Sequence, residues 1–230
     1  MHQHNNTGNN VEQPRVLAVL RSVLPSKRRL WFGEALRIAE LQANKLLEQA
    51  SITDGPVPSE IVTGLPRIAV EYDIDMPCSG ASDWDSHRRT WVITLNALEP
   101  ETRHRFSLLH EYHHIICHGS PGLVDLGSFR YFGREPVEYV AEYFAGCALM
   151  PKRLVKRAWG EGIQRLSELA DHFDVSPQAM SVRLAQLGLT EPRPRCAPPT
   201  RQTFTARRGR YHRSLSAHRP VPHLPQEVAV

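Results

Sequence analysis

The order of apolar and polar residues in the first half of the chain predicts two helices followed by two strands. Apolar residues recur at helical spacing over residues 15–24 and 32–50. Residues 67–72 and 89–96 are rich in β-branched and aromatic residues, which is typical of strands. The polar stretch 77–87 between them is predicted to be a loop. This half therefore supplies a small β-sheet and an N-terminal pair of helices.

The second half is predicted to be helical. A helix is expected to begin near Glu99 and to run through SLLHEYHHIICHG, residues 107–119. Another is expected from about Pro136 to Met150, because Pro151 cannot continue it. Residues 163–189 are predicted to form two short helices around a turn, in the manner of a helix-turn-helix. Together the two halves predict an α+β fold.

Composition and punctuation divide the chain into a folded body and two terminal segments. The polar start and the Arg- and Pro-rich end lack any periodicity and are predicted to be disordered. The expected organisation is a disordered N-terminus (1–13), N-terminal helices (14–63), a core domain (64–160), a helix-turn-helix-like segment (161–189) and a disordered tail (190–230).

Hydropathy and charge exclude some classes of protein. No apolar run is long enough to span a membrane, and the N-terminus lacks the layout of a signal peptide, so a cytoplasmic location is expected. The four cysteines form no CxxC pair and are expected to be free thiols. The net charge of the whole chain is +4, and the tail from residue 190 alone carries +6. The first 189 residues therefore carry 4 − 6 = −2. The basic character belongs to the tail.

The histidine-rich helix carries the first candidate chemistry. At about 100° per residue, His110, His114 and His118 share one face with Glu111, whereas His113 lies on the apolar side. His110, Glu111 and His114 form the pattern HExxH, in which two imidazoles one turn apart bind one metal ion. Zinc in a catalytic site needs a third protein ligand and a water, and Glu111 is placed to act on that water as general base.

The third ligand is sought on the helix that follows. Glu138 and Glu142 lie one turn apart on one face, with small residues beyond them that allow close helix packing. Glu138 suits the third ligand position, and Glu142 would then accept a hydrogen bond from a ligating imidazole. His118 is the alternative, although three ligands in line on one straight helix do not surround a tetrahedral ion.

Taken together, the stretches RFSLLHEYHH and ExxAExFAxxALMP closely resemble the ImmA/IrrE family of metallo-endopeptidases, over roughly residues 64–189. The resemblance implies a compact zincin-like α+β domain that holds one Zn²⁺ on His110, His114 and Glu138, with Glu111 as the catalytic base. It also implies a cytosolic regulator whose substrate is a helix-turn-helix repressor. The chain departs from the family at His113, where glycine is frequent, and at Glu142, where Asp or Asn is common.

Several roles are open at this level. The oxyanion of the reaction needs a donor, for which Tyr131, Tyr139 and Tyr143 are candidates. The strand over residues 89–96 is a candidate edge for pairing with an extended substrate, and the aromatic segment 127–133 is a candidate lid.

Two alternative functions remain. The segment 163–189, with Arg183 and the basic tail, would suit a DNA-binding regulator, and the tail alone would suit weak nucleic-acid contact. A zinc protein that sequesters a repressor or toxin without hydrolysis is the third possibility, although such a protein has no need of Glu111.

Overall fold

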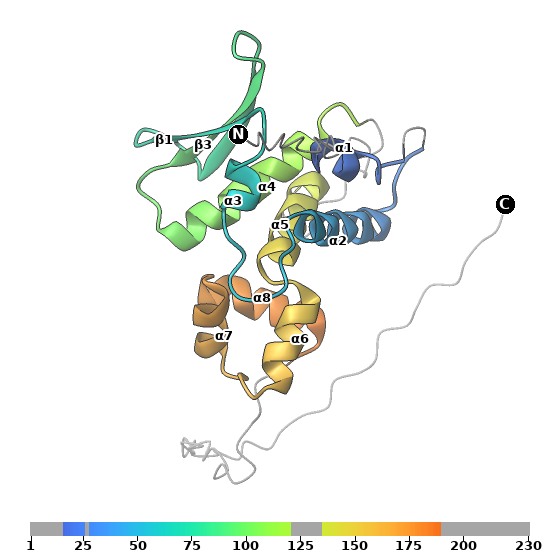
Figure 1. Ribbon diagram of the computed structural model, residues 1–230, viewed down its shortest axis with the longest axis vertical. Helices are drawn as coiled ribbons and strands as arrows, with labels where there is room; N and C mark the ends of the chain where they lie inside the picture. Colours follow the sequence, from blue (N-terminus) through green and yellow to red (C-terminus); the bar gives the residue numbers. More distant parts are fainter. Residues whose placement is uncertain (1–15, 26–27, 121–134, 190–230) are drawn as a thin grey trace, which may run out of the picture. The chain divides into compact units, whose positions relative to one another are not determined.

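The predicted α+β class is confirmed by the computed structural model, which describes residues 16–25, 28–120 and 135–189. Within these ranges, helices and strands follow one another as α1 (Val16–Arg21), α2 (Phe32–Gln49), α3 (Glu60–Thr63), β1 (Ile68–Asp73), β2 (Gly80–Asp85), β3 (Thr90–Asn96), α4 (Glu101–Cys117), α5 (Pro136–Leu149), α6 (Lys152–Gly160), α7 (Leu166–Phe173) and α8 (Pro177–Leu187) (Figure 1). The predicted disordered ends and the aromatic segment 127–133 lie outside the described residues.

The sheet corrects two predictions. Residues 77–87, predicted to be a loop, contain strand β2, which pairs antiparallel with β3. The strand order is β1-β3-β2, so β3 lies at the centre and is not an edge. The sequence GASDWD of β2 is too polar and small to predict a strand by itself. It becomes a strand because the hairpin returns it to the backbone groups of β3, with Trp84 opposite Trp91.

The sheet packs against helix α4, which contacts both β2 and β3 (Figure 1). Alternate residues of a strand share a face, so Gly80, Ser82 and Trp84 of β2 lie on the same side. The cross-strand register places Ile93 opposite Ser82 and Leu95 opposite Gly80. Ile93 and Leu95 are fully buried and form the apolar support for α4. The small residues of β2 continue this face to the sheet edge.

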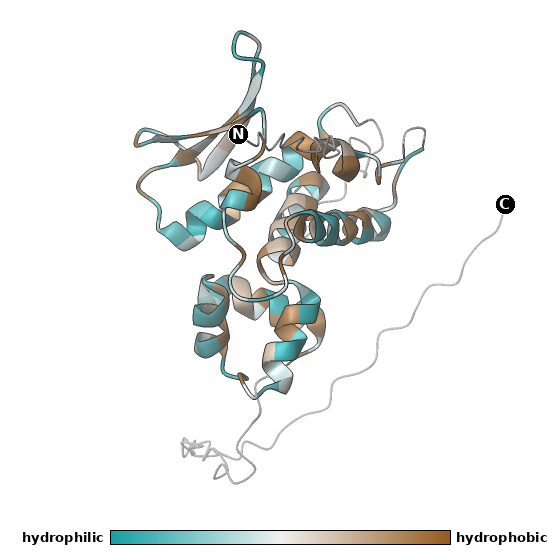
Figure 2. Ribbon diagram, in the orientation of Figure 1, coloured by the Kyte–Doolittle hydropathy of each residue, from teal (hydrophilic) through white to brown (hydrophobic). Residues whose placement is uncertain are grey.

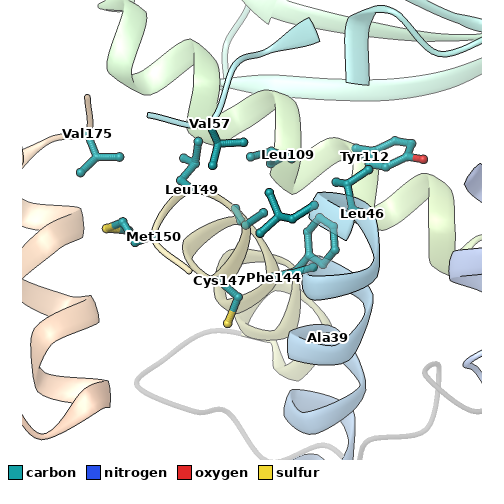
Figure 3. Close-up of a cluster of buried hydrophobic side chains, with 14 of the residues drawn as sticks. Ala39, Leu46, Val57, Leu109, Tyr112, Phe144, Cys147, Leu149, Met150 and Val175 are labelled. Carbon is teal, nitrogen blue, oxygen red and sulfur yellow. The ribbon is translucent and has the colours of Figure 1, made fainter. Parts of the chain in front are cut away.

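The hydrophobic core lies between α2, α4 and α5. Ala39 and Leu46 of α2 meet Leu109 of α4 and Phe144 of α5 in this cluster (Figure 3). Helix α2 alternates between hydrophilic and hydrophobic residues along its length, as a half-exposed helix does (Figure 2). The second half of α5 is buried on nearly all sides. Helix α5 is therefore the central element of the helical layer.

The two short helices predicted over residues 163–189 are present as α7 and α8. Ser176 begins α8 by accepting a hydrogen bond from the Ala179 amide, and Gly188 ends it with a left-handed backbone conformation. Two buried arginines tie this pair to the rest of the fold. Arg105 of α4 donates to the Phe173 carbonyl, and Arg183 of α8 donates to the Met150 carbonyl at 2.9 Å.

Helices α3 and α6 were not predicted from the sequence. Helix α3 is a single turn in a segment punctuated by proline and glycine. Helix α6 begins directly after Pro151 and buries Leu154, Val155 and Ala158. None of the described helices has the length and apolar character that crossing a membrane requires.

Candidate metal centre

His110, His114 and Glu138 come together on facing helices. One helical turn separates the two histidines on α4, and Glu138 lies in the first turn of α5, which packs against α4. His110 Nε2 is 3.1 Å from His114 Nε2 and 3.2 Å from a Glu138 oxygen, and His114 Nε2 is 3.5 Å from the other oxygen. Among the described residues, these form the one group of three potential metal ligands close enough to share an ion.

These separations fit a tetrahedral metal ion. Zinc takes imidazole nitrogen and carboxylate oxygen at about 2.0–2.2 Å, which places neighbouring tetrahedral ligand atoms about 3.3–3.5 Å apart. The observed separations, which involve both oxygens of Glu138, are close to that edge length: 3.1 and 3.2 Å are slightly shorter and 3.5 Å matches it. Two imidazole nitrogens at 3.1 Å with lone pairs toward each other also need a cation or a shared proton between them. The donor set and its spacing thus suit a metal.

The electrostatics keep the carboxylate ionised. Hydrogen bonds from His110, which has the larger effect, and from His114 hold the pKa of Glu138 well below its usual range. Burial of the carboxylate acts on the pKa in the opposite direction and is outweighed. Burial lowers the pKa of His114, but the hydrogen bond and the charge of Glu138 outweigh it, so the net direction is upward. Metal binding must therefore displace protons held between these groups.

Glu111 faces the sheet and is not one of the three potential ligands. It is 9% exposed, and the Ser82 hydroxyl donates a hydrogen bond to its carboxylate at 3.0 Å. Strand β2 approaches so closely that a Cβ on Gly80 would lie 3.1 Å from Glu111 Cγ. The carboxylate is thus oriented by β2 while its backbone neighbour, His110, points to α5. The sequence does not reveal Ser82 and Gly80 as part of the site, because the polar stretch that contains them predicts a loop.

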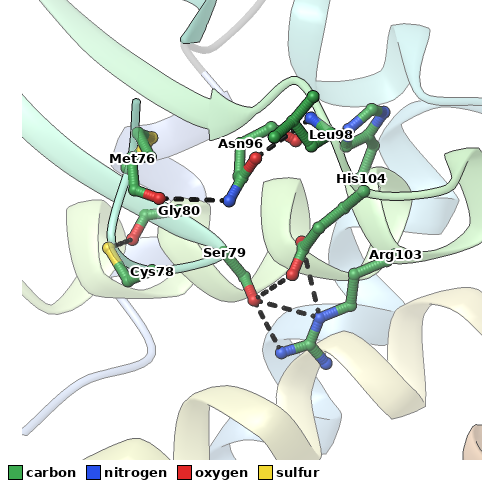
Figure 4. A network of polar contacts seen from close by, with 9 residues as sticks. Met76, Cys78, Ser79, Gly80, Asn96, Leu98, Arg103 and His104 are labelled. Atoms are coloured by element: carbon green, nitrogen blue, oxygen red, sulfur yellow. Dashed lines mark hydrogen bonds and ion pairs between the residues drawn. The ribbon is translucent and has the colours of Figure 1, made fainter. Parts of the chain in front are cut away.

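A polar network fixes the start of β2 beside α4. The Ser79 hydroxyl donates to Glu99 at 2.7 Å and accepts from Arg103 of α4 at 3.0 Å (Figure 4). The Asn96 side chain donates to the Met76 carbonyl at 3.2 Å, and the His104 ring lies 2.8 Å from the Asn96 carbonyl. These contacts connect the chain before β2, the end of β3 and the first turns of α4.

His113 lies on the apolar side, where the helical periodicity places it, but His118 does not share the face of His110 and His114, because the backbone leaves the helix at this residue. His113 is 2% exposed, and its ring packs against Phe144 with centroids 4.9 Å apart. Its burial, with the nearby charges of His114 and His110, lowers its pKa to about 3, so it is neutral. His118 is the C-terminal cap of α4 and packs edge-on against Trp91. It is not part of the ligand group.

The remaining candidate residues of α5 line a groove of about 560 Å³ beside the metal group. Tyr139, Glu142 and Tyr143 all contribute to its wall. Tyr143 also stacks under the Arg183 guanidinium, and its burial raises its pKa to about 12. Tyr131 lies outside the described residues. The role of Glu142 behind an imidazole and the identity of the oxyanion donor stay predictions.

Together the α+β fold, the HExxH helix and the glutamate of the next helix define a metallopeptidase-type domain. Residues 76–185 match the family model described as the IrrE N-terminal-like domain, and this domain of the chain belongs to that peptidase family. The family expected from the sequence is therefore confirmed. The match begins just before β2 and ends within α8, so it includes the helix-turn-helix-like segment.

The fold is also similar to that of a solved structure, a Mycobacterium tuberculosis transcriptional regulator. The TM-score is 0.51 with 17% sequence identity, over 79% of this chain and 54% of that protein. The chain thus spans about half the length of this structural neighbour, and the likeness concerns the fold alone. No curated protein matches the chain at a significant level.

Proposed function

We propose that the protein is a zinc-dependent endopeptidase of the cytoplasm, with one ion held by His110, His114 and Glu138. The observation that carries the proposal is the convergence of two imidazoles and one carboxylate from facing helices. The two imidazole nitrogens are 3.1 Å apart, and each lies 3.2–3.5 Å from a different oxygen of Glu138. Three protein ligands leave a fourth position for water or substrate, as catalytic zinc sites require. Membership of a peptidase family supports the same reaction.

In this proposal Glu111 is the general base. When bound, zinc supplies Lewis-acid stabilisation and acidifies a water molecule. The Glu111 carboxylate would accept a proton from the attacking water and pass it to the leaving amine of the cleaved peptide bond. The hydrogen bond from Ser82 holds the carboxylate in place and leaves its second oxygen to act. Burial against β2 limits the positions that the carboxylate can take, which favours a precise proton transfer.

The substrate is proposed to pair with the sheet edge at β2. The earlier candidate, β3, is central and its backbone groups are already paired on both sides. Strand β2 pairs with β3 along one side only within the described residues, and Ser82 brings it next to Glu111. An extended peptide added to this edge would pass the metal group. A helix-turn-helix repressor is the proposed substrate, supported by the family resemblance and by the regulator named among similar structures.

Direct DNA binding by α8 is less well supported than hydrolysis. Arg183, the arginine of the predicted recognition segment, is 1% exposed and donates to a backbone carbonyl. The solvent-facing residues of α8 are uncharged, among them Gln178, Ser181 and Val182. Phosphate contacts need accessible cations, and the described part of α8 offers none. Weak nucleic-acid contact by the basic tail remains a separate proposal about residues outside the described ranges.

The test is a comparison of Glu111→Gln with the wild-type protein in cells that also express candidate repressors. Glutamine keeps the size of the side chain and its reach toward Ser82, but it does not accept the proton. Cleavage on a gel should fall by at least about 10²-fold while bound zinc is retained. Glu101→Gln, an exposed position on the same helix, is the matched control and should cleave normally.

Two outcomes contradict the proposal. Equal cleavage by the wild type and Glu111→Gln would remove Glu111 from the mechanism. Firm repressor binding by both proteins, with cleavage by neither, would identify a sequestering protein in place of a peptidase.

A further inference from the structure

A groove separates α8 from the antiparallel helices α4 and α5. It encloses about 560 Å³, within the size range of ligand-binding clefts. Its walls come from the first turns of α4, the middle and end of α5, and the outer side of α8. Thus the helix-turn-helix-like segment forms one wall of a cleft beside the metal group.

The groove lies next to the candidate metal centre. Phe106 lines the groove one turn before His110 on α4, and Glu142 lines it one turn after Glu138 on α5. At 1.5 Å per residue, one turn of helix places these wall residues about 6 Å along the axis, and Gly146 lies about 12 Å along α5. An extended peptide advances about 3.3 Å per residue. Residues two to four positions from a bond at the metal would therefore reach the groove.

The floor of the groove is apolar. Gly146, Leu149, Met150 and Ala179 line it, and the first three are buried. A Cβ on Gly146 would meet only the end of the Met150 side chain, at 4.0 Å, so the space above this glycine is open. Methionine is flexible and adapts its shape to a partner. Such a floor suits an inserted apolar side chain.

The sides of the groove include one exposed apolar residue and two arginines that interact with other groups of the protein. Val182 of α8 is 48% exposed on the groove wall, although a valine gains by being covered. The Arg103 guanidinium donates to Ser79 and lies over the Phe106 ring. Arg183 is 1% exposed and bound to the Met150 carbonyl. Both arginines are therefore engaged with other groups of the protein, and Arg183 is too buried to present an accessible charge to the groove.

We propose that this groove is the specificity subsite of the peptidase, which binds a large apolar side chain (Leu, Met or Phe) of the substrate within four residues of the cleaved bond. The inference rests on the proposed function and adds to it the chemistry of the substrate. It also gives α8 a role, as the wall that closes the subsite. Burying one such side chain is worth about 1.5–3 kcal/mol, a preference of roughly 10- to 150-fold over a small residue.

The experiment measures cleavage of a peptide library. In this library, the four positions before the cleaved bond and the four positions after it are varied one at a time. The wild type should prefer Leu, Met or Phe to Gly or Asp by at least about 10-fold at one of these positions. Gly146→Leu fills the floor, and Val182→Trp narrows the wall, so each should reduce the preference to less than about threefold. Peptides with alanine at that position should still be cut, and the zinc content should be unchanged.

Ser181→Trp is the matched control. It adds the same bulk at the neighbouring exposed position of α8, which does not line the groove. It should leave the preference intact. A preference that survives both groove variants, or is absent in the wild type while cleavage proceeds, would overturn the subsite and leave the peptidase in place.

Binding without cleavage separates the two proposals. This experiment uses the Glu111→Gln protein and a fluorescently labelled peptide with leucine at the preferred position. The leucine peptide should bind at least about 10-fold more tightly than the same peptide with glycine at that position. If the wild type cuts no peptide, leucine is placed at each of the eight positions in turn. Adding Gly146→Leu should abolish this difference. If the wild type cuts no peptide but this apolar preference is found and is lost in the groove variant, hydrolysis is wrong and the groove is a binding site. If neither cleavage nor binding discriminates, the subsite is wrong.

Discussion

The helix pair α4/α5 and the helix pair α7/α8 both involve charged or titratable side chains in contacts between helices. The two sets of side chains differ in their hydrogen-bond partners and in their exposure to solvent. His110, His114 and Glu138 are satisfied chiefly by one another, and their side chains are 15%, 25% and 50% exposed. Arg105 and Arg183, which anchor α7/α8, are almost fully buried and donate to backbone carbonyls.

The difference separates a binding site from a structural anchor. A buried charge that donates to main-chain carbonyls is held by the fold itself, even where, as at Arg183, one guanidinium nitrogen has no hydrogen-bond partner among the described residues. Polar groups that meet only each other, within reach of solvent, keep lone pairs available for another species. On this basis, losing a group from the first set should cost metal affinity, and losing one from the second should cost folding stability. The following predictions test that division, from the largest effect to the smallest.

The largest effect is expected for metal binding. Glu138→Ala removes one of three proposed ligands, which should weaken zinc affinity on the order of 10³-fold, or roughly 4 kcal/mol, a share of the 10–16 kcal/mol typical of structural zinc sites. Competition with a chromogenic chelator measures the affinity. His118→Ala, outside the ligand group, is the control and should bind zinc as the wild type does. Full zinc retention in Glu138→Ala would show that the third ligand lies elsewhere.

Arg105→Met should lower the free energy of unfolding by about 3 kcal/mol. The change leaves the carbonyl of Val57, now 2.6 Å from the guanidinium, without its donor, and it also removes the ion pair with Asp174. Arg88→Met is the control, because its ion pair with Glu71 is solvent-exposed and should contribute little to stability. Urea denaturation measures both. Equal losses would contradict the view of Arg105 as an anchor.

Acidification should destabilise the protein through His113. Its pKa in the folded state is about 3, against 6.5 for an unperturbed histidine. Between these values the unfolded chain binds more protons than the folded one, so stability falls as the pH decreases. From pH 7 to pH 5 the wild type should lose about 2 kcal/mol more than His113→Leu. Urea denaturation with a chelator present measures this difference without a contribution from metal release, and an equal loss in both proteins would refute it.

The smallest effect is expected at Gly146. Alanine has a higher helix propensity than glycine, and a Cβ at this position meets nothing closer than 4.0 Å. Gly146→Ala should therefore stabilise the protein by about 0.5–1 kcal/mol, seen as a higher denaturation midpoint. A destabilised variant would mean that the floor of the groove is more tightly packed than its contacts indicate.

Much of this site could be predicted from the helical periodicity of the sequence. The ranges of α2, α4 and α5 differ from their predicted limits by at most two residues, because each has a strong apolar stripe and two have a proline that marks a boundary. The pairing of His110 with His114, and the separate apolar position of His113, follow from helical geometry alone. These are properties of neighbours along the chain, so no knowledge of the tertiary fold is needed.

Contacts between segments that are distant in the sequence could not be predicted from local periodicity. Strand β2 owes its conformation to hydrogen bonds with β3, and its polar residues predict a loop. Ser82 therefore could not be placed beside Glu111, 29 positions away. Arg183 resembled an exposed DNA contact in the sequence, yet it is buried because the Met150 carbonyl and the Tyr143 ring receive it. An arginine pattern does not reveal which surface will cover it.

The sequence by itself determined the metal-binding pattern on α4, the carboxylate on α5 and the family to which they belong, since each depends on residue types at helical spacing. Only the tertiary structure decided that Glu138 faces both histidines, that β2 is the sheet edge next to Glu111, and that α8 closes a groove beside them. Those outcomes depend on how α5 and the hairpin pack against α4. Packing of this kind is set by the shapes of side chains far apart in the chain, which no local pattern encodes.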